Sequence, residues 1–89
     1  MNPRLVILAF LAERSPGAYP DDVISHRVNA SGLVDAPVPS IASELTFLAS
    51  ERMGRLVSCD INQVTKTAVW YATEAGIRQW VLDGRPHVV

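Results

Sequence analysis

The side chains that could perform acid–base, nucleophilic or metal chemistry are few and lie far apart in the sequence. The chain has one cysteine, Cys59, and two histidines, His26 and His87, and no pattern links them to a second metal ligand or to a catalytic base. The Gly-x-Ser-x-Gly signature of a nucleophilic serine and the glycine-rich loops that bind phosphate are also missing from the sequence. We therefore expect a protein that is not an enzyme and that binds no metal and no cofactor.

The charged side chains suggest a second kind of chemistry, the binding of nucleic acid. Eight Lys and Arg residues stand against nine Asp and Glu residues, which gives a net charge of −1. Proteins that bind nucleic acid through their overall charge carry a positive excess. A basic surface would therefore require uneven placement of the cations, and four of them are candidates for it: Arg27, Arg52, Arg55 and Lys66.

Length and composition indicate one small globular domain. The 89 residues, 48% of them hydrophobic, leave room for a single core, which we place at about residues 3–84 of a domain spanning 1–89. The longest apolar run, Leu5–Ala12, is far shorter than the roughly 18 residues of a membrane span, and it is followed by two charged residues where a signal peptide has small ones. A single cysteine cannot form an internal disulfide. We therefore expect a cytoplasmic protein without membrane contact.

The first expected helix runs from Pro3 to Arg14, with Asn2 as its N-cap. Nearly every residue from 5 to 11 is apolar, so this helix should be covered on more than one side. In so short a chain, one other layer of structure can cover only one side of this helix. The apolar surface that remains predicts a homodimer or another protein partner. The alternative is that the helix is simply central within the domain. The residues expected at such an interface are Leu5, Val6, Phe10 and Trp80.

Two more helices are expected before Gly54. The second begins at Asp21 and Asp22, where the helix dipole favours acids, and it ends near Gly32. Its core residues should be Ile24, Val28 and Val23. Two prolines make residues 33–39 a stiff turn. The third helix should run from about Pro39 to Met53, and its core stripe should consist of Ile41, Leu45 and Leu48.

The pattern then changes to that of a β-hairpin followed by a last helix. Residues 56–60 and 66–72 are rich in Val, Thr, Trp and Tyr and predict two strands, with a turn near Asn62 and Gln63. Thr73 should cap a helix that ends at Asp83, with Gly84 as its stop. Its inward residues are expected to be Ile77, Trp80 and Val81, and residues 85–89 are expected to be loose.

Two segments carry a resemblance to a known superfamily. One consists of Ser40, Ile41, Leu45, Leu48, Gly54, Arg55, Leu56 and Val57, and the other of Trp70, Tyr71, Ala72, Thr73, Glu74, Ala75 and Gly76. With this order of elements, nearly the whole chain resembles the winged helix-turn-helix superfamily, in particular small MarR- and PadR-type regulator domains. The resemblance implies an α+β, mostly α, fold in which the third helix enters the major groove of DNA and the hairpin touches the backbone.

The face of the third helix opposite its core stripe is poor in the usual DNA-reading residues. Between Ser40 and Glu51 there is no Arg, Lys, Asn or Gln, the types that most often read guanine and adenine. Serines could contact bases or phosphates, Glu44 could accept from cytosine, and Phe47 could touch a thymine methyl or belong to the core or a protein contact. The residues expected to bind DNA are Ser40, Ser43, Glu44, Arg52, Arg55 and Lys66. The alternative for the three cations is that they are solvated surface charges that contact no phosphate.

Two functions follow from these expectations. The first is a small DNA-binding transcriptional regulator that acts as a dimer on double-stranded DNA, of the kind that bacteria and phages carry as short single-domain proteins. The second keeps the fold without the DNA, as a winged-helix adaptor or inhibitor that binds another protein. The element order favours the first, and the near-neutral charge with the acidic, serine-rich third helix favours the second.

Overall fold

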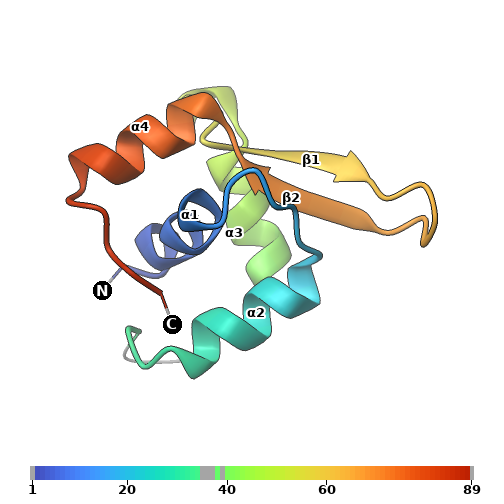
Figure 1. Ribbon diagram of the computed structural model, residues 1–89, viewed down its shortest axis with the longest axis horizontal. Coiled ribbons are helices and arrows are strands. Elements are labelled where there is room, and N and C mark those ends of the chain that lie inside the picture. Colours follow the sequence, from blue (N-terminus) through green and yellow to red (C-terminus); the bar gives the residue numbers. More distant parts are fainter. Residues whose placement is uncertain (1, 35–37, 39, 89) are drawn as a thin grey trace.

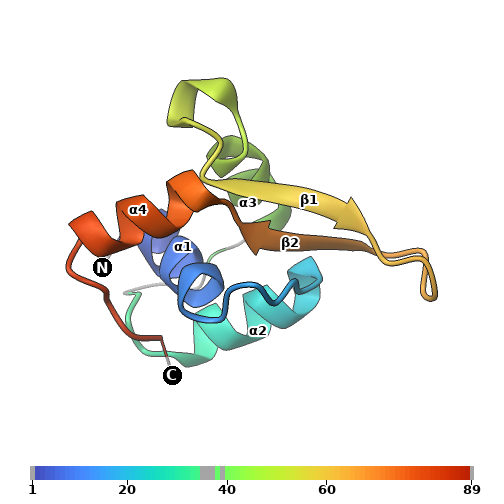
Figure 2. The same ribbon diagram turned by 45° about the horizontal axis from the view of Figure 1, so that its top comes forward.

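The computed structural model describes residues 2–34, 38 and 40–88. Within these residues the chain is an α+β protein, about half helical, in which four α-helices pack together and a two-stranded antiparallel hairpin projects from them (Figures 1 and 2). The elements are α1 (Pro3–Glu13), α2 (Asp21–Ala30), α3 (Ile41–Leu48), the 3-10 helix η1 (Glu51–Met53), β1 (Val57–Ile61), β2 (Ala68–Ala72) and α4 (Glu74–Leu82). None of the described helices has the length and apolar content needed to cross a bilayer.

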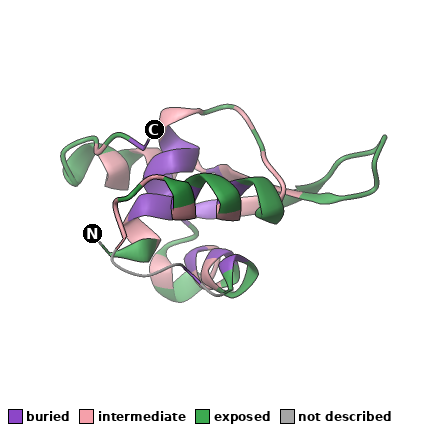
Figure 3. Cartoon of the chain, turned by 90° about the horizontal axis from the view of Figure 1, so that it is seen from below, coloured by how far each residue is buried: buried purple, intermediate pink, exposed green. Residues whose placement is uncertain are grey.

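The helix α1 lies at the centre of the molecule and contacts α2, α3, α4 and β2. Every residue from Val6 to Ala12 is buried (Figure 3). This corrects the expectation that α1 leaves apolar surface for a partner: Val6 and Phe10 are 0% and 1% exposed within a single chain, so they cannot form an interface. Leu5, at the first turn, remains partly exposed. The prediction failed because α2, α3, α4 and the hairpin approach α1 from several sides instead of forming one layer.

The helices α2 and α3 pack against each other and against α1 through short apolar stripes. Ile24 and Val28 of α2 are buried as predicted, whereas Val23 points outward and is exposed. The predicted stiff turn at 33–39 lies largely outside the described residues. Of its described part, Val38 is buried, and its backbone N–H donates to Oδ1 of Asn29 at 2.7 Å.

The helix α3 has the predicted core stripe but is shorter than predicted. Ile41, Leu45 and Leu48 are all buried. The helix ends at Leu48 and does not continue to residue 53, because Ser50 adopts an extended backbone (ψ 155°) and its hydroxyl donates to the carbonyl of Phe47 at 2.6 Å. Such local bonds compete with helix continuation. The chain then forms η1, and Gly54 follows it with φ 82°, the left-handed backbone expected where a helix stops.

The hairpin β1–β2 is antiparallel, with Val57 opposite Ala72 and Ile61 opposite Ala68. The strand β2 also pairs briefly with Tyr19, because Tyr19 and Trp70 exchange two backbone hydrogen bonds of 2.9 and 2.8 Å. The predicted second strand began too early, at residue 66. Lys66 instead lies in the connecting loop with a left-handed backbone (φ 59°).

The helix α4 is capped as predicted by Thr73, whose side chain accepts from the backbone N–H of Gly76 at 3.1 Å. Gly84 follows it with φ 92°. Two expectations for this region were wrong. Val81 is exposed on the outer side of α4, and the tail is packed against the chain over its described residues, 85–88.

Several hydrogen bonds hold this tail. Nη2 of Arg14 donates to the carbonyl of Val88 at 2.9 Å, the N–H of Val88 donates to Oε2 of Glu13 at 3.1 Å, and Nε1 of Trp80 donates to the carbonyl of Pro86 at 2.9 Å. The side chain of Val88 is completely buried. Residues 85–88 therefore close the core beside the end of α1.

Candidate nucleic-acid interface

The face of α3 that points away from the core carries short, uncharged side chains. Ala42, Ser43 and Thr46 are exposed there, and Ser40 is exposed just before the helix. Their hydroxyls are bonded locally: Oγ of Ser40 donates to Oγ of Ser43 at 3.0 Å, and Oγ1 of Thr46 donates to the carbonyl of Ala42 at 2.8 Å. This arrangement leaves a helix surface of short side chains that another molecule can approach closely.

Arg4 occupies the edge of this face and engages the two largest side chains predicted there. Its Nε donates to Oε2 of Glu44 at 2.5 Å, and its guanidinium carbon lies 3.9 Å from the centre of the Phe47 ring. The carboxylate of Glu44 is therefore held in an ion pair with Arg4, and the half-buried ring of Phe47 lies beneath the Arg4 guanidinium. Sequence patterns do not indicate this contact, because Arg4 and Glu44 are 40 residues apart.

Two of the predicted phosphate ligands lie around η1, beyond the end of α3. Arg52 is exposed and has no ion pair within the part of the chain that the structure describes. Arg55 is also exposed, but its Nη2 donates to Oε1 of Glu51 at 2.5 Å. Arg55 follows Gly54 with a left-handed backbone of its own (φ 53°), a conformation that non-glycine residues seldom adopt.

The third predicted cation, Lys66, lies in the loop that joins the two strands. Its backbone N–H donates to the carbonyl of Asn62 at 2.7 Å, and Nζ donates to Oε1 of Gln63 at 3.4 Å. Oδ1 of Asn62 accepts from the N–H groups of Val64 and Thr65 and so orders the tip. The hairpin thus holds a cation at its far end, well away from the helical core (Figure 1).

Two acidic side chains lie close to the start of α3. Asp21 and Asp22, in the first turn of α2, share a hollow of about 310 Å³ with Ser40 and Ala42. Both carboxylates are exposed, and they would repel a phosphate placed beside Ser40. From the sequence these residues were assigned only to the helix dipole, because nothing in it places them beside Ser40.

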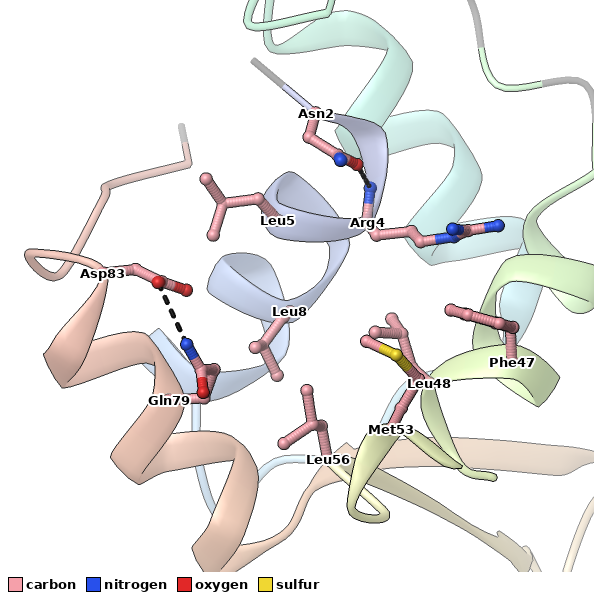
Figure 4. A pocket seen from close by; sticks show the side chains of 10 residues that line it. All are labelled: Asn2, Arg4, Leu5, Leu8, Phe47, Leu48, Met53, Leu56, Gln79 and Asp83. Carbon is pink, nitrogen blue, oxygen red and sulfur yellow. Dashed lines mark hydrogen bonds between the residues drawn. The ribbon is translucent and has the colours of Figure 1, made fainter. Parts of the chain in front are cut away.

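A larger groove of about 420 Å³ lies where α1, α3, η1 and α4 meet (Figure 4). Its floor is apolar, and its edges carry Asn2, Arg4, Gln79 and Asp83. Nε2 of Gln79 donates to Oδ1 of Asp83 at 3.1 Å, while Arg4 points across the groove edge toward Phe47 (Figure 4). The apolar floor consists of Leu5, Leu8, Leu48, Met53 and Leu56.

The cysteine and the two histidines lie on three different segments of the described chain. Cys59 is an exposed free thiol on β1, His26 is exposed on α2, and His87 contacts Glu13. No group of three His, Cys, Asp or Glu side chains that could hold a metal ion occurs among the described residues. Comparisons of the chain with known protein families, curated proteins and solved structures gave no match.

Proposed function

We propose that this protein is a small cytoplasmic DNA-binding regulator of the winged helix-turn-helix type. In this proposal α3 enters the major groove and the hairpin β1–β2 contacts the adjacent backbone. The observation that carries it is the combination of α3 and the hairpin. The helix buries Ile41, Leu45 and Leu48 and exposes a face of short side chains, while a projecting hairpin carries Lys66 at its end.

The short side chains on α3 are compatible with close approach to base edges. The hydroxyl of Ser43 can donate to or accept from bases, and that of Thr46, whose proton is bonded to the carbonyl of Ala42, can accept. The methyl groups of Ala42 and Thr46 can contact thymine methyls. The face lacks the Arg, Lys, Asn and Gln side chains that give strong direct readout. We therefore expect modest sequence preference from a single copy of the chain.

Phosphate contacts would come from the cations around this face. Arg52, Arg55 and Lys66, with Arg27 on α2, supply up to four, which corresponds to a slope of about −3 to −4 in log affinity against log salt. Asp21 and Asp22 oppose this attraction at the start of α3. Binding should consequently be weak at physiological salt and much stronger when the salt concentration falls.

The test is a titration of fluorescently labelled duplex DNA at about 50 mM and about 200 mM salt, read by anisotropy. We expect binding at the lower concentration and loss of roughly two orders of magnitude in affinity at the higher one. The double variant Asp21→Asn with Asp22→Asn should bind more tightly, because it removes two carboxylates beside Ser40. Absence of binding at the lower salt concentration, by both proteins, would reject the proposal.

A second candidate function is a protein-binding module that does not bind DNA. It is favoured by the two carboxylates beside Ser40, by the ion pair that already engages Glu44 with Arg4, and by the apolar groove of Figure 4. It predicts that neutralising Asp21 and Asp22 leaves the protein without measurable affinity for DNA. The same titration therefore separates the two functions.

A further inference from the structure

The outer side of α4 carries an apolar patch. Leu82 is 80% exposed and Val81 is 42% exposed, and together with Ile77 and Arg78 they line a shallow, open hollow of about 300 Å³. Exposure of adjoining large aliphatic side chains is unfavourable in water unless another surface covers them. This patch is separate from the groove of Figure 4, which reaches α4 through Gln79 and Asp83.

A second hollow begins where the patch ends. It has a volume of about 520 Å³, and Ile77 lines it together with Tyr71 and Val69 of β2 and residues of the α1–α2 connection. Because Ile77 belongs to both hollows, the patch and the second hollow form one continuous surface. The strand β2 and the helix α4 run in the same general direction (Figures 1 and 2), so the protruding Leu82 and the second hollow lie toward opposite ends of this surface.

Charges of both signs lie on this surface. Glu74 and Arg78 lie one helical turn apart on the same side of α4, with Nη1 of Arg78 3.9 Å from Oε1 of Glu74. Asp60, on β1, also borders the second hollow. A surface with one acid and one base along the helix attracts neither a strongly acidic nor a strongly basic partner. It is complementary to itself when a second helix runs in the opposite direction.

We propose that this surface of α4 binds a second copy of the same chain, with the two α4 helices antiparallel. A twofold axis near Gly76 places Glu74 beside the partner's Arg78, and Arg78 beside the partner's Glu74. In the same arrangement Val81 and Leu82 reach the hollow bordered by the partner's Tyr71. One surface thus supplies both the protruding residues and the hollow that receives them, as a closed twofold dimer requires.

This interface differs from the one expected from the sequence. That expectation placed Leu5, Val6, Phe10 and Trp80 at the contact, but Val6 and Phe10 are buried and Nε1 of Trp80 is bonded to the carbonyl of Pro86. The dimer proposed here also does not depend on DNA binding. It is measured on the protein alone, so its failure and the failure of the DNA proposal are distinguishable.

Sedimentation equilibrium of the full chain without DNA, from about 1 µM to about 1 mM, tests the proposal. We expect a reversible monomer–dimer equilibrium in the wild type and a dissociation constant at least about tenfold higher for Leu82→Glu. The matched control is Val64→Glu, because Val64 is 91% exposed at the hairpin tip and lies outside the surface. Its dissociation constant should equal that of the wild type.

A pair of charge reversals tests the antiparallel arrangement. Glu74→Arg alone should weaken the dimer by placing two arginines together, and Glu74→Arg with Arg78→Glu should restore it, since the double variant exchanges the charges within each ion pair. Circular dichroism verifies that each variant is folded. A wild type that stays monomeric at about 1 mM, equal effects of the Leu82 and Val64 variants, or a double variant no tighter than the single one would each overturn the proposal.

Discussion

Gly76 of α4 lies directly against the backbone of Leu56. A Cβ atom placed on Gly76 would lie 1.9 Å from the carbonyl oxygen of Leu56 and 3.1 Å from Cδ1 of Leu8. The oxygen belongs to the chain that enters β1, so it cannot move aside as a flexible side chain would. The missing side chain at position 76 is what allows α4 to approach both the start of the hairpin and α1.

We therefore predict that Gly76→Ala destabilises the protein by about 3 kcal/mol, the upper end of the usual cost of overpacking. Chemical unfolding followed by tryptophan fluorescence measures the change. The control is Gly54→Ala, where a Cβ meets nothing within 4 Å but the backbone has φ 82°. That variant should lose about 1–2 kcal/mol through its backbone alone; an equal or larger loss than that of Gly76→Ala would contradict the packing argument.

Thr73 joins the same two elements through its hydroxyl. Oγ1 donates to the carbonyl of Arg55 at 2.6 Å and accepts from the N–H of Gly76 at 3.1 Å. Thr73→Val keeps the shape and removes both bonds, so we predict a loss of about 1–3 kcal/mol in the free energy of unfolding. Thr73→Ser retains the hydroxyl and should stay close to the wild type. If both variants unfold alike, the hydroxyl is not the stabilising group.

For the DNA proposal, we predict different effects from a cation and from a helix-face residue. Arg55→Ala and Lys66→Ala should each lower the salt slope by about 1 and weaken binding to all duplexes similarly, as loss of a phosphate contact does. Ser43→Ala should instead change the preference among duplex sequences. Competition titrations with several duplexes measure both quantities.

The control for these variants is Arg85→Ala. Arg85 is exposed in the tail after α4 and lies outside α3, η1 and the hairpin. Its replacement should leave the affinity of a single chain for DNA unchanged. A drop in affinity equal to that of Arg55→Ala would place the DNA elsewhere on the molecule.

The contact between Glu13 and the tail makes stability depend on pH in the acidic range. Burial raises the pKa of Glu13. The hydrogen bonds from Val88 and His87 and the charges of His87 and Arg14 together lower the pKa by more than burial raises it, so it lies below the ordinary 4.5. A carboxyl group whose folded pKa is depressed contributes stability above its unfolded pKa and loses it as the pH falls through the folded value.

We accordingly predict that the free energy of unfolding decreases as the pH falls below 4.5 and that Glu13→Gln makes this decrease shallower. Urea unfolding at a series of pH values between about 3 and 7 measures both slopes. Parallel slopes for the two proteins would show that Glu13 does not gain its proton on unfolding in this range.

The parts of the fold that depend on neighbouring residues could be predicted from the sequence. Asn2 and Thr73 cap their helices, and Gly54 and Gly84 adopt left-handed backbones at the expected ends. The stripe at 41, 45 and 48 is buried because its spacing follows the helical period. Each of these features is fixed within about one helical turn.

The features that the sequence did not reveal depend on contacts between distant segments. The Arg4–Glu44 pair joins residues 40 positions apart, and the bonds between Glu13 and the tail join residues 74 or 75 positions apart. The early end of α3 depends on one hydroxyl at Ser50, which the apolar periodicity does not register. Of the candidate site, the cations and serines were identified from the sequence, but Asp21 and Asp22 beside them were not.

The central position of α1 has a consequence for how the molecule comes apart. Since α2, α3, α4 and β2 all contact this one helix, none of them can detach without opening the interior to water. Partial unfolding should therefore be confined to the hairpin tip and other peripheral segments. The slowest amide protons to exchange with solvent should belong to α1, and their exchange rate should report the stability of the entire chain.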